Sequence, residues 1–173
     1  MRSCYFNQAA SIARIPAQTS AEASAYVAKA IARASTPRDV ERFLLTAGSD
    51  TSLGCPANVD AISRIVGQHR PGATLQKLYR ARGATQAQIL AAYGEGPNVA
   101  VYDGHGDHTG MTEIPFQIQH LTGLGNRSLP IILDIACLNA NWPSGGGSRR
   151  NFAESMLLIP EHGAAGIVAA GGN

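Results

Sequence analysis

The sequence predicts an α/β fold, with a mainly parallel sheet of about five strands and helices on both of its faces. Strand-like apolar runs and helix-like segments alternate five times along the 173 residues, which is the order that parallel strands joined by helical crossovers require. No segment alternates apolar and polar residues over a sustained length, as an antiparallel sheet with one solvated face would. The two most apolar runs, 99–105 and 131–137, are therefore expected to be neighbouring buried strands.

Five runs have the length and composition of strands. The first, Arg42–Ala47, leads into a Gly-Ser-Asp sequence, and the second, Ala73–Tyr79, is less apolar, which places it nearer an edge of the sheet. The runs 99–105 and 131–137 are rich in β-branched residues, and 166–170 is the last strand before a Gly-Gly-Asn end. Each run is followed by glycine or polar loop residues.

The helices are indicated by capping residues at their N-terminal ends. Residues 19–22 and 85–88 both have the pattern of a capping box, and Asn151 with Glu154 repeats it. Asn58 is a further N-cap. Helical segments are expected at 19–34, after Thr36-Pro37, at 59–68, at 86–94, within 112–123 and at 152–162. Residues 1–18 are expected to be irregular, so that one domain covers 19–173.

Composition and charge exclude several classes of function. The net charge of +2 with 15% charged residues gives no reason to expect a nucleic acid or an anionic membrane as partner. No apolar run reaches the roughly 18 residues of a membrane span, and the N-terminus lacks the apolar core of a signal peptide. Three cysteines are too few for a disulfide framework, with a single Cys4–Cys55 bridge left as an alternative. No cofactor or metal motif is expected.

Each of the two central runs ends on a residue that can do chemistry. His105, between Gly104 and Gly106, closes the first run, and Cys137 closes the second. Ligands of open α/β sheets bind beyond the carboxyl ends of the strands, so we expect the imidazole and the thiol at one edge. Cys137 could be a nucleophile with His105 as its base, and the N–H groups of Gly106 and Cys137 could form an oxyanion hole. The alternatives are a buried structural cysteine and a turn histidine whose glycines serve only the backbone.

Both motifs resemble those of the caspase-like clan of cysteine peptidases, most closely the gingipain family. Residues 101–106, Val-Tyr-Asp-Gly-His-Gly, resemble the strand of that family that ends in Tyr-x-Gly-His-Gly. Residues 135–140, Ile-Ala-Cys-Leu-Asn-Ala, resemble its nucleophile strand. Ala13–Pro16, with Lys29 in the next helix, resembles its Gly-Arg-hydrophobic-Pro … Lys segment, and 152–164 resembles the elements that follow the nucleophile. The resemblance covers nearly the whole chain.

The resemblance implies a caspase-like three-layer α/β/α sandwich and a cysteine endopeptidase acting on peptide or protein substrates. It implies Cys137 as the nucleophile that forms a thioester and His105 as the general acid/base. The residue that orients the imidazole is expected to be Asp50, ahead of Asp103. The relatives carry an N-terminal subdomain and further strands, so the chain is similar to the catalytic subdomain only, and a partner chain or missing subdomain is expected at the exposed sheet edges. The relatives are mostly secreted, whereas this chain shows no leader.

Four further residues are candidates for substrate contacts. Asp60 is the candidate counterpart of the acidic residue that gives some gingipains their preference for arginine. Trp142 could line a substrate pocket or anchor the loop after Cys137. Arg149 and Arg150 could hold a substrate carboxylate or be solvated charges ahead of the last helix.

Two other functions compete with the peptidase hypothesis. The cluster Asp103, His105, Asp107 and His108 imitates the zinc-binding His-x-His-x-Asp-His run of metallo-β-lactamase-type hydrolases, although Asp stands where the first His is expected. The third hypothesis is a truncated, non-catalytic caspase-like domain that binds a partner through open sheet edges.

Overall fold

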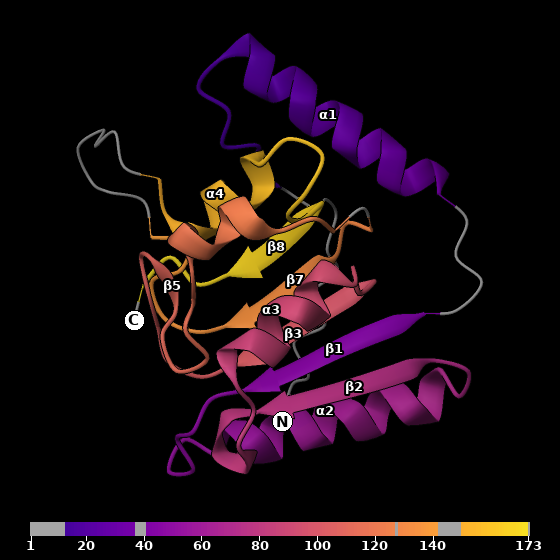
Figure 1. Ribbon diagram of the computed structural model, residues 1–173, viewed down its shortest axis with the longest axis vertical. Helices are drawn as coiled ribbons and strands as arrows, with labels where there is room; N and C mark the ends of the chain where they lie inside the picture. The colour runs from indigo at the N-terminus through magenta and orange to yellow at the C-terminus, as the bar shows by residue number, and fades with distance from the viewer. Residues whose placement is uncertain (1–12, 37–40, 127, 142–149, 173) are drawn as a thin grey trace, which may run out of the picture.

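The computed structural model describes residues 13–36, 41–126, 128–141 and 150–172. Its centre is a five-stranded sheet in the order β2-β1-β3-β7-β8, in which every pair is parallel. The strands are β1 (Arg42–Ala47), β2 (Thr74–Tyr79), β3 (Val99–Asp103), β7 (Ile131–Ile135) and β8 (Gly166–Ala169). The predicted class and strand number are confirmed, and the less apolar β2 is an edge strand as expected. In Figure 1 the arrowheads of β1, β7 and β8 point to the same side of the molecule.

Helices cover the sheet on both faces and give the molecule three layers (Figure 1). They are α1 (Ser20–Ser35), α2 (Cys55–His69), α3 (Gln86–Gly94) and α4 (Phe152–Leu158), with the 3₁₀ turns η1 (Arg80–Arg82) and η2 (Ile118–Gly123). α2 packs on β1 and β3 from one side, while α3 and α4 pack on the other. No helix in the described ranges has both the length and the apolar character to cross a membrane.

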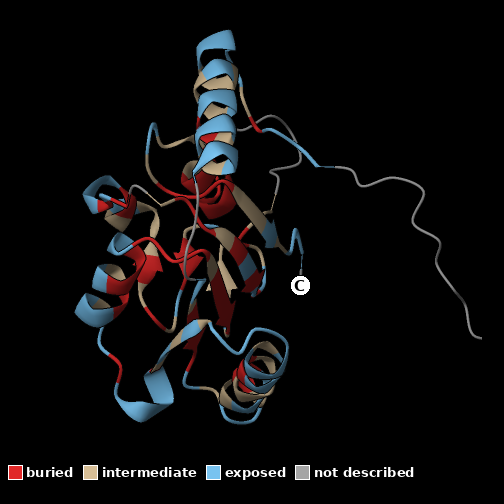
Figure 2. Cartoon of the chain, turned by 90° about the vertical axis from the view of Figure 1, so that its right-hand side faces the viewer, coloured by how far each residue is buried: buried red, intermediate tan, exposed pale blue. Residues whose placement is uncertain are grey.

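Two clusters of buried residues, one on each face of the sheet, form the core. Leu44 of β1 lies in the larger cluster with residues of α3 and α4, whereas its neighbour Leu45 lies in the smaller cluster with Val59 of α2. Successive strand residues point to opposite faces, so a strand buried on both faces is apolar at consecutive positions. Figure 2 shows the strands largely buried, while the long helix α1 is mostly exposed.

The capping-box predictions hold in two of three cases. Thr85 with Gln88 and Asn151 with Glu154 form the reciprocal bonds of a capping box. Before α1, Thr19 accepts from the backbone N–H of Glu22, but the Glu22 carboxylate accepts from Gln18 rather than from Thr19. The box at α1 is therefore only half formed, because the acid binds the preceding residue.

Two helix boundaries differ from the expectation. α2 begins at Cys55 rather than at 59, because Pro56 is accepted in the first helical turn and Gly54 is the N-cap with a φ of 73°. The prediction of Asn58 as N-cap is therefore wrong, since Asn58 lies inside the helix. α4 ends at Leu158 rather than at 162, because Ile159 precedes Pro160 and takes an extended conformation. The helical turn expected at Thr36-Pro37 falls largely outside the described residues.

The segment 104–117, which joins β3 to η2, forms a small antiparallel sheet that the sequence did not indicate. Its strands are β4 (Gly106–Asp107), β5 (Gly110–Met111) and β6 (Phe116–Gln117). A helix was expected within 112–123, but only the 3₁₀ turn η2 forms there. Strands of two residues are too short to give a periodic pattern, so sequence periodicity misses them. In Figure 1 this small sheet lies on the side to which the strands of the main sheet point.

One part of the main sheet is left uncovered by the described residues. Leu133, Ile135 and Val168 point to the face that α2 covers over β1 and β3, and they are 40%, 46% and 65% exposed. A buried sheet face carries such residues only when another layer packs on it. β8 is also an edge strand, so its outer backbone groups face away from the sheet.

α1 is held against the main domain by a buried lysine. Lys29 is 4% exposed, and its ammonium group donates to the carbonyl oxygens of Leu157 (2.9 Å) and Ile159 (2.8 Å), at the C-terminal end of α4. Burial lowers the pKa of Lys29 to about 8. Arg150, just before α4, pairs with Glu22 of α1. The C-terminal end of a helix carries partial negative charge, so it suits a buried cation.

Lys29→Met should lower the free energy of unfolding by about 1–3 kcal/mol, because two carbonyl groups lose their donor inside the structure. Urea denaturation measures the loss. The matched control is Lys77→Met, which removes an exposed ion pair to Asp60 and should cost about 0.5 kcal/mol. Equal losses in the two variants would contradict the anchoring role of Lys29.

Candidate functional site

The register between β3 and β7 brings the two candidate catalytic residues to one edge of the sheet. Asp103 pairs with Ile135, the last residue of each strand, and the N–H of Gly104 donates to the carbonyl of Ile135 at 3.2 Å. His105 and Cys137 each follow two residues later. Both strands end two residues earlier than expected, so these side chains stand on the loops beyond the sheet, and both are exposed.

The backbone of His105 is fixed on both sides. Its N–H donates to Glu113 Oε2 at 2.9 Å. Its carbonyl oxygen accepts from the Tyr102 hydroxyl at 2.7 Å and from the N–H and hydroxyl of Thr112 at 3.1 and 3.0 Å. The side chain is 53% exposed. The imidazole is thus solvent-accessible while its main chain is held in place.

Asp50, in the loop after β1, contacts the imidazole directly. His105 Nε2 lies 3.0 Å from Asp50 Oδ2. A carboxylate can only accept a hydrogen bond, so Nε2 carries the proton and Nδ1 is left to exchange a proton with another group. The other Asp50 oxygen accepts from Ser52 and Leu53. The bonds from Ser52 and His105 hold the pKa of Asp50 well below its ordinary range.

The same contact raises the pKa of His105, with a smaller contribution from the charge of Glu113. Asp103, the other candidate for orienting the imidazole, instead accepts from Asn58 at 2.9 Å. The structure therefore pairs His105 with Asp50, in agreement with the expected ranking. The catalytic role of the pair stays a prediction.

Glu113, in the turn between β5 and β6, ties the loop of Asp50 to the loop of His105. Its Oε1 accepts from the N–H groups of Ser49 (2.8 Å) and Asp50 (3.0 Å) and from the Ser49 hydroxyl, while Oε2 accepts from His105. Burial alone would raise the pKa of Glu113, but these hydrogen bonds outweigh it and the pKa is lowered. No motif marks Glu113 in the sequence, where its segment was expected to be helical.

Two glycines allow this close approach. A Cβ built on Gly104 would lie 2.7 Å from Glu113 Oε2 and even closer to the Tyr102 hydroxyl, and one built on Gly48 would collide with the Glu113 carboxylate. Any side chain at these positions would push the carboxylate out of its place. Gly104 therefore serves the packing of the His105 loop as well as leaving the imidazole open.

The loop after β7 presents Cys137 and is fastened to β8 and α4. Leu138 adopts a left-handed φ of 62°, which turns the chain directly after Cys137. Ala140 donates to Ala170 at 3.0 Å, and the carbonyl of Asn139 accepts from the N–H of Ala153 at 3.0 Å. Cys137 is a free, exposed cysteine. The alternative of a buried structural cysteine is therefore wrong.

Gly106 is the point where the two loops touch. A Cβ built on Gly106 would lie 2.6 Å from Asn139 Oδ1 and 2.9 Å from the Cβ of Ala136, the residue before Cys137. Only a residue without a side chain permits this contact. The backbone of Gly106 thus lies directly against the cysteine loop, where an oxyanion donor is expected.

The ligand cluster of the zinc hypothesis does not assemble. Asp107 accepts from the backbone N–H groups of Thr109 and Gly110, and Asp103 is engaged by Asn58. The described parts of the chain hold no group of three or more His, Cys, Asp or Glu side chains arranged to bind a metal ion.

Of the four expected substrate-contact residues, the structure describes Asp60 and Arg150, and both form ion pairs with other residues of the chain. Asp60 accepts from Lys77, the hydroxyl of Tyr79 and Arg82. Arg150 pairs with Glu22 instead of facing a substrate. Trp142 and Arg149 lie outside the described residues. Cys55 is free and buried, whereas Cys4, the other half of the alternative bridge, is not described.

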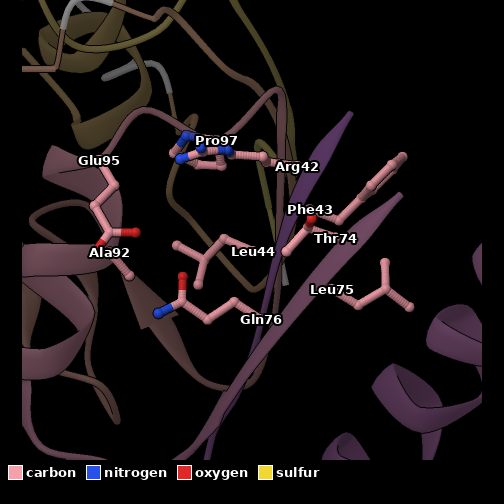
Figure 3. A pocket seen from close by; sticks show the side chains of 9 residues that line it. All are labelled: Arg42, Phe43, Leu44, Thr74, Leu75, Gln76, Ala92, Glu95 and Pro97. Carbon is pink, nitrogen blue, oxygen red and sulfur yellow. The ribbon is translucent and has the colours of Figure 1, made fainter. Parts of the chain in front are cut away.

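A cavity of about 370 Å³ lies at the other end of the main sheet and is not part of this site. It is formed by the first residues of β1 and β2, together with Glu95 and Pro97 before β3 (Figure 3). These residues are at the amino ends of parallel strands, whereas His105 and Cys137 follow the carboxyl ends. Ligands of such sheets bind at the carboxyl ends.

The chain resembles known peptidases in its sequence profile and in its fold. The sequence profile of peptidase family C25 matches residues 6–173. The structure is similar to that of the Arg-specific cysteine proteinase gingipain R (RgpB), with a TM-score of 0.74 and 22% identity over 91% of this chain and 39% of that one. It is also similar to a complex of the RgpB pro- and mature domains from Porphyromonas gingivalis (TM-score 0.76, 22% identity, 94% and 41% covered).

A third structure, described as a protease, is similar with a TM-score of 0.77 and 20% identity over 92% of this chain and 36% of that chain. No curated protein matches the sequence. The chain spans about two fifths of the length of the gingipain chains it matches. The expected caspase-like α/β fold is confirmed by this likeness.

Asp50→Asn should lower the pKa of His105 toward its ordinary value of 6.5, because the imidazolium loses the carboxylate that stabilises it. In the wild type this contact favours the folded state below pH 6.5, and its contribution is lost as the pH rises through the raised pKa. A proton–carbon NMR titration of the imidazole measures the change. Asp107→Asn removes a nearby charge without removing a bond to His105, so an equal shift in that variant would contradict the assignment.

Glu113→Gln should lower the free energy of unfolding by about 1–3 kcal/mol, because an amide can accept on one side only and turns a donor toward the N–H groups on the other. Urea denaturation checks the value. The exposed Glu95→Gln is the control, with an expected change within about 0.5 kcal/mol. A Glu113→Gln variant as stable as the control would show that the carboxylate does not hold the two loops.

Proposed function

The chain belongs to peptidase family C25, and we propose that it carries the catalytic residues of a cysteine endopeptidase, with Cys137 as the nucleophile and His105 as the general acid/base. The observation that supports this most is the in-register end of β3 and β7, which leaves an exposed imidazole and an exposed thiol two residues beyond paired strand ends.

The proposed reaction begins with attack of the Cys137 sulfur on a peptide carbonyl. The thiol proton passes to His105 Nδ1, and the carbonyl oxygen becomes an oxyanion. The N–H groups of Gly106 and Cys137 are the expected donors to that oxyanion. His105 then gives its proton to the leaving amine, the C–N bond breaks, and a thioester remains on Cys137.

A water molecule completes the proposed cycle. His105 Nδ1 takes a proton from the water, and the hydroxide adds to the thioester carbonyl. The C–S bond then breaks, the carboxylic acid product leaves, and His105 returns its proton to the Cys137 thiolate. Throughout, Asp50 holds Nε2 and stabilises the imidazolium form. A general acid/base of this kind contributes about 10²–10⁴-fold to the rate.

The substrate is a peptide or protein chain, and a further domain or chain is the proposed partner. The uncovered face formed by Leu133, Ile135 and Val168 supports a partner, because it is apolar and lies next to the open edge at β8. One of the similar gingipain structures is a complex of pro- and mature domains. We place the partner on this face and not on the edge where Cys137 stands.

The test is covalent labelling with a peptidyl acyloxymethyl ketone, followed by mass spectrometry of the modified peptide. We expect capture at Cys137 and not at Cys55, which is buried and whose pKa is raised to about 12 by burial and by the neighbouring Asp103. His105→Ala should slow the capture by about 10²-fold or more.

Cys137→Ala is the control for folding. It should abolish hydrolysis of a peptide library and change the free energy of unfolding by less than about 0.5 kcal/mol, because Cys137 is exposed. Equal labelling of Cys55 and Cys137, with no effect of His105→Ala, would favour the non-catalytic binding domain over the peptidase.

A further inference from the structure

Asp134 is a carboxyl group inside the core, on the strand that leads to Cys137. It is 4% exposed, and its strand neighbours are Tyr102 of β3 and Ala169 of β8. None of the ion pairs between described residues includes Asp134. A buried carboxylate without a cation is strongly disfavoured. Burial accordingly raises the pKa of Asp134 to about 7, although a hydrogen bond from Asn139 acts in the opposite direction.

Asp134 and Asn139 form a hydrogen-bonded pair in which one oxygen of each side chain has no hydrogen-bond partner among the described residues. Asn139 Nδ2 donates to Asp134 Oδ2 at 2.7 Å. The remaining atoms, Asp134 Oδ1 and Asn139 Oδ1, are buried and have no hydrogen-bond partner among the described residues. Both are acceptors if the acid is ionised, so neither can satisfy the other. One proton on Asp134 Oδ1 removes both deficits, because a carboxylic acid and a primary amide form a ring with two hydrogen bonds.

We propose that Asp134 is held as a neutral carboxylic acid that pairs with the amide of Asn139 through two hydrogen bonds and thereby positions the loop after Cys137. Within this loop, the side chain of Asn139 packs against Gly106. A Cβ built on Gly106 would lie 2.6 Å from Asn139 Oδ1 and 2.9 Å from Asn139 Nδ2. Its carbonyl also accepts from Ala153 at the start of α4. The pair therefore fixes the place where the cysteine loop, the histidine loop and α4 meet.

Among the described residues, the titratable groups whose pKa responds to the charge of Asp134 are two tyrosines. The titratable groups that face it are Tyr93 of α3 and Tyr102 of β3, and burial raises the pKa of both far above the ordinary range. α4 contributes Phe152 and Met156 to the same core cluster. Asp134 is thus expected to change its charge independently of these neighbours.

The sign of the pH dependence follows from the raised pKa. The ordinary value is 3.8 and the folded value is about 7, so between these values the folded state keeps a proton that the unfolded state releases. Stability therefore falls as the pH rises through this window and levels off above it. The contribution of Asp134 to the unfolding equilibrium constant rises about tenfold per pH unit within the window.

Asp134→Asn tests the pair, because two amides form the same ring at every pH. We expect the unfolding equilibrium constants of wild type and variant, measured in urea from pH 4 to 8, to diverge by about tenfold per unit up to pH 7. Asp60→Asn is the matched control. The pKa of Asp60 is lowered to about 2, chiefly by the hydrogen bond from Arg82, so that variant should run parallel to wild type.

The carbon-13 shift of the Asp134 carboxyl group gives the direct readout in the wild-type protein. Titration near pH 7 is expected, and titration near 3.8 would overturn the proposal, as would parallel unfolding curves for wild type and Asp134→Asn. Neither readout depends on hydrolysis. A protein that shows the expected titration but hydrolyses no peptide would contradict the proposed function and leave the acid–amide pair standing.

The positioning role rests on the proposed function and needs a kinetic readout. Asp134→Leu keeps the side chain neutral but breaks the ring, so kcat/KM for peptide hydrolysis should fall about tenfold or more, mainly through kcat. Asp134→Asn rebuilds the ring and should recover most of that loss. If both variants hydrolyse equally well, Asp134 does not position the cysteine loop.

Discussion

The parallel pairing of β3 with β7 is the constraint on which the site depends. Because Asp103 and Ile135 are partners, the two following loops start from the same height at one edge of the sheet. A shift of one residue in this register would move one loop along the sheet and turn its strand over. Burial of both faces of β3 protects the register, since Val101 and Tyr102 belong to different core clusters. The strands thus decide where the thiol and the imidazole stand.

Beyond the strand ends, the positions of the loops are set by hydrogen bonds to the backbone and by glycines, which have no side chain and so allow close contact. Glu113 joins the loops of Asp50 and His105 through their N–H groups. Gly106 lets the histidine loop lie against the cysteine loop without an intervening Cβ. A loop held in this way needs no large core of its own, which suits exposed residues that must meet a substrate. The charge of Asp50 then favours the imidazolium form.

The sequence was sufficient for the parts that repeat a regular pattern. Buried strands such as β1 are apolar at consecutive positions, and caps such as Asn151 with Glu154 have a fixed spacing, so the class, the strand number and the edge position of β2 were predictable. Glu113 was not, because most of its partners are main-chain N–H groups, those of Ser49, Asp50 and His105, and a main-chain group leaves no trace in side-chain type. The two-residue strands of the small sheet carry no period. Asp134 lies in a strand that is otherwise apolar, and its burial and its bond to Asn139 become visible only in the structure.

The proposed mechanism requires the sulfur of Cys137 and the ring of His105 to be neighbours in space. Carboxymethylation of Cys137 with iodoacetate, in a Cys4→Ser background, adds one negative charge at the sulfur, and NMR then gives the pKa of each histidine. We expect the pKa of His105 to rise, since a nearby anion favours the imidazolium, while that of the distant, exposed His69 stays the same. A pKa of His105 that does not respond to the added charge would contradict the proposed mechanism.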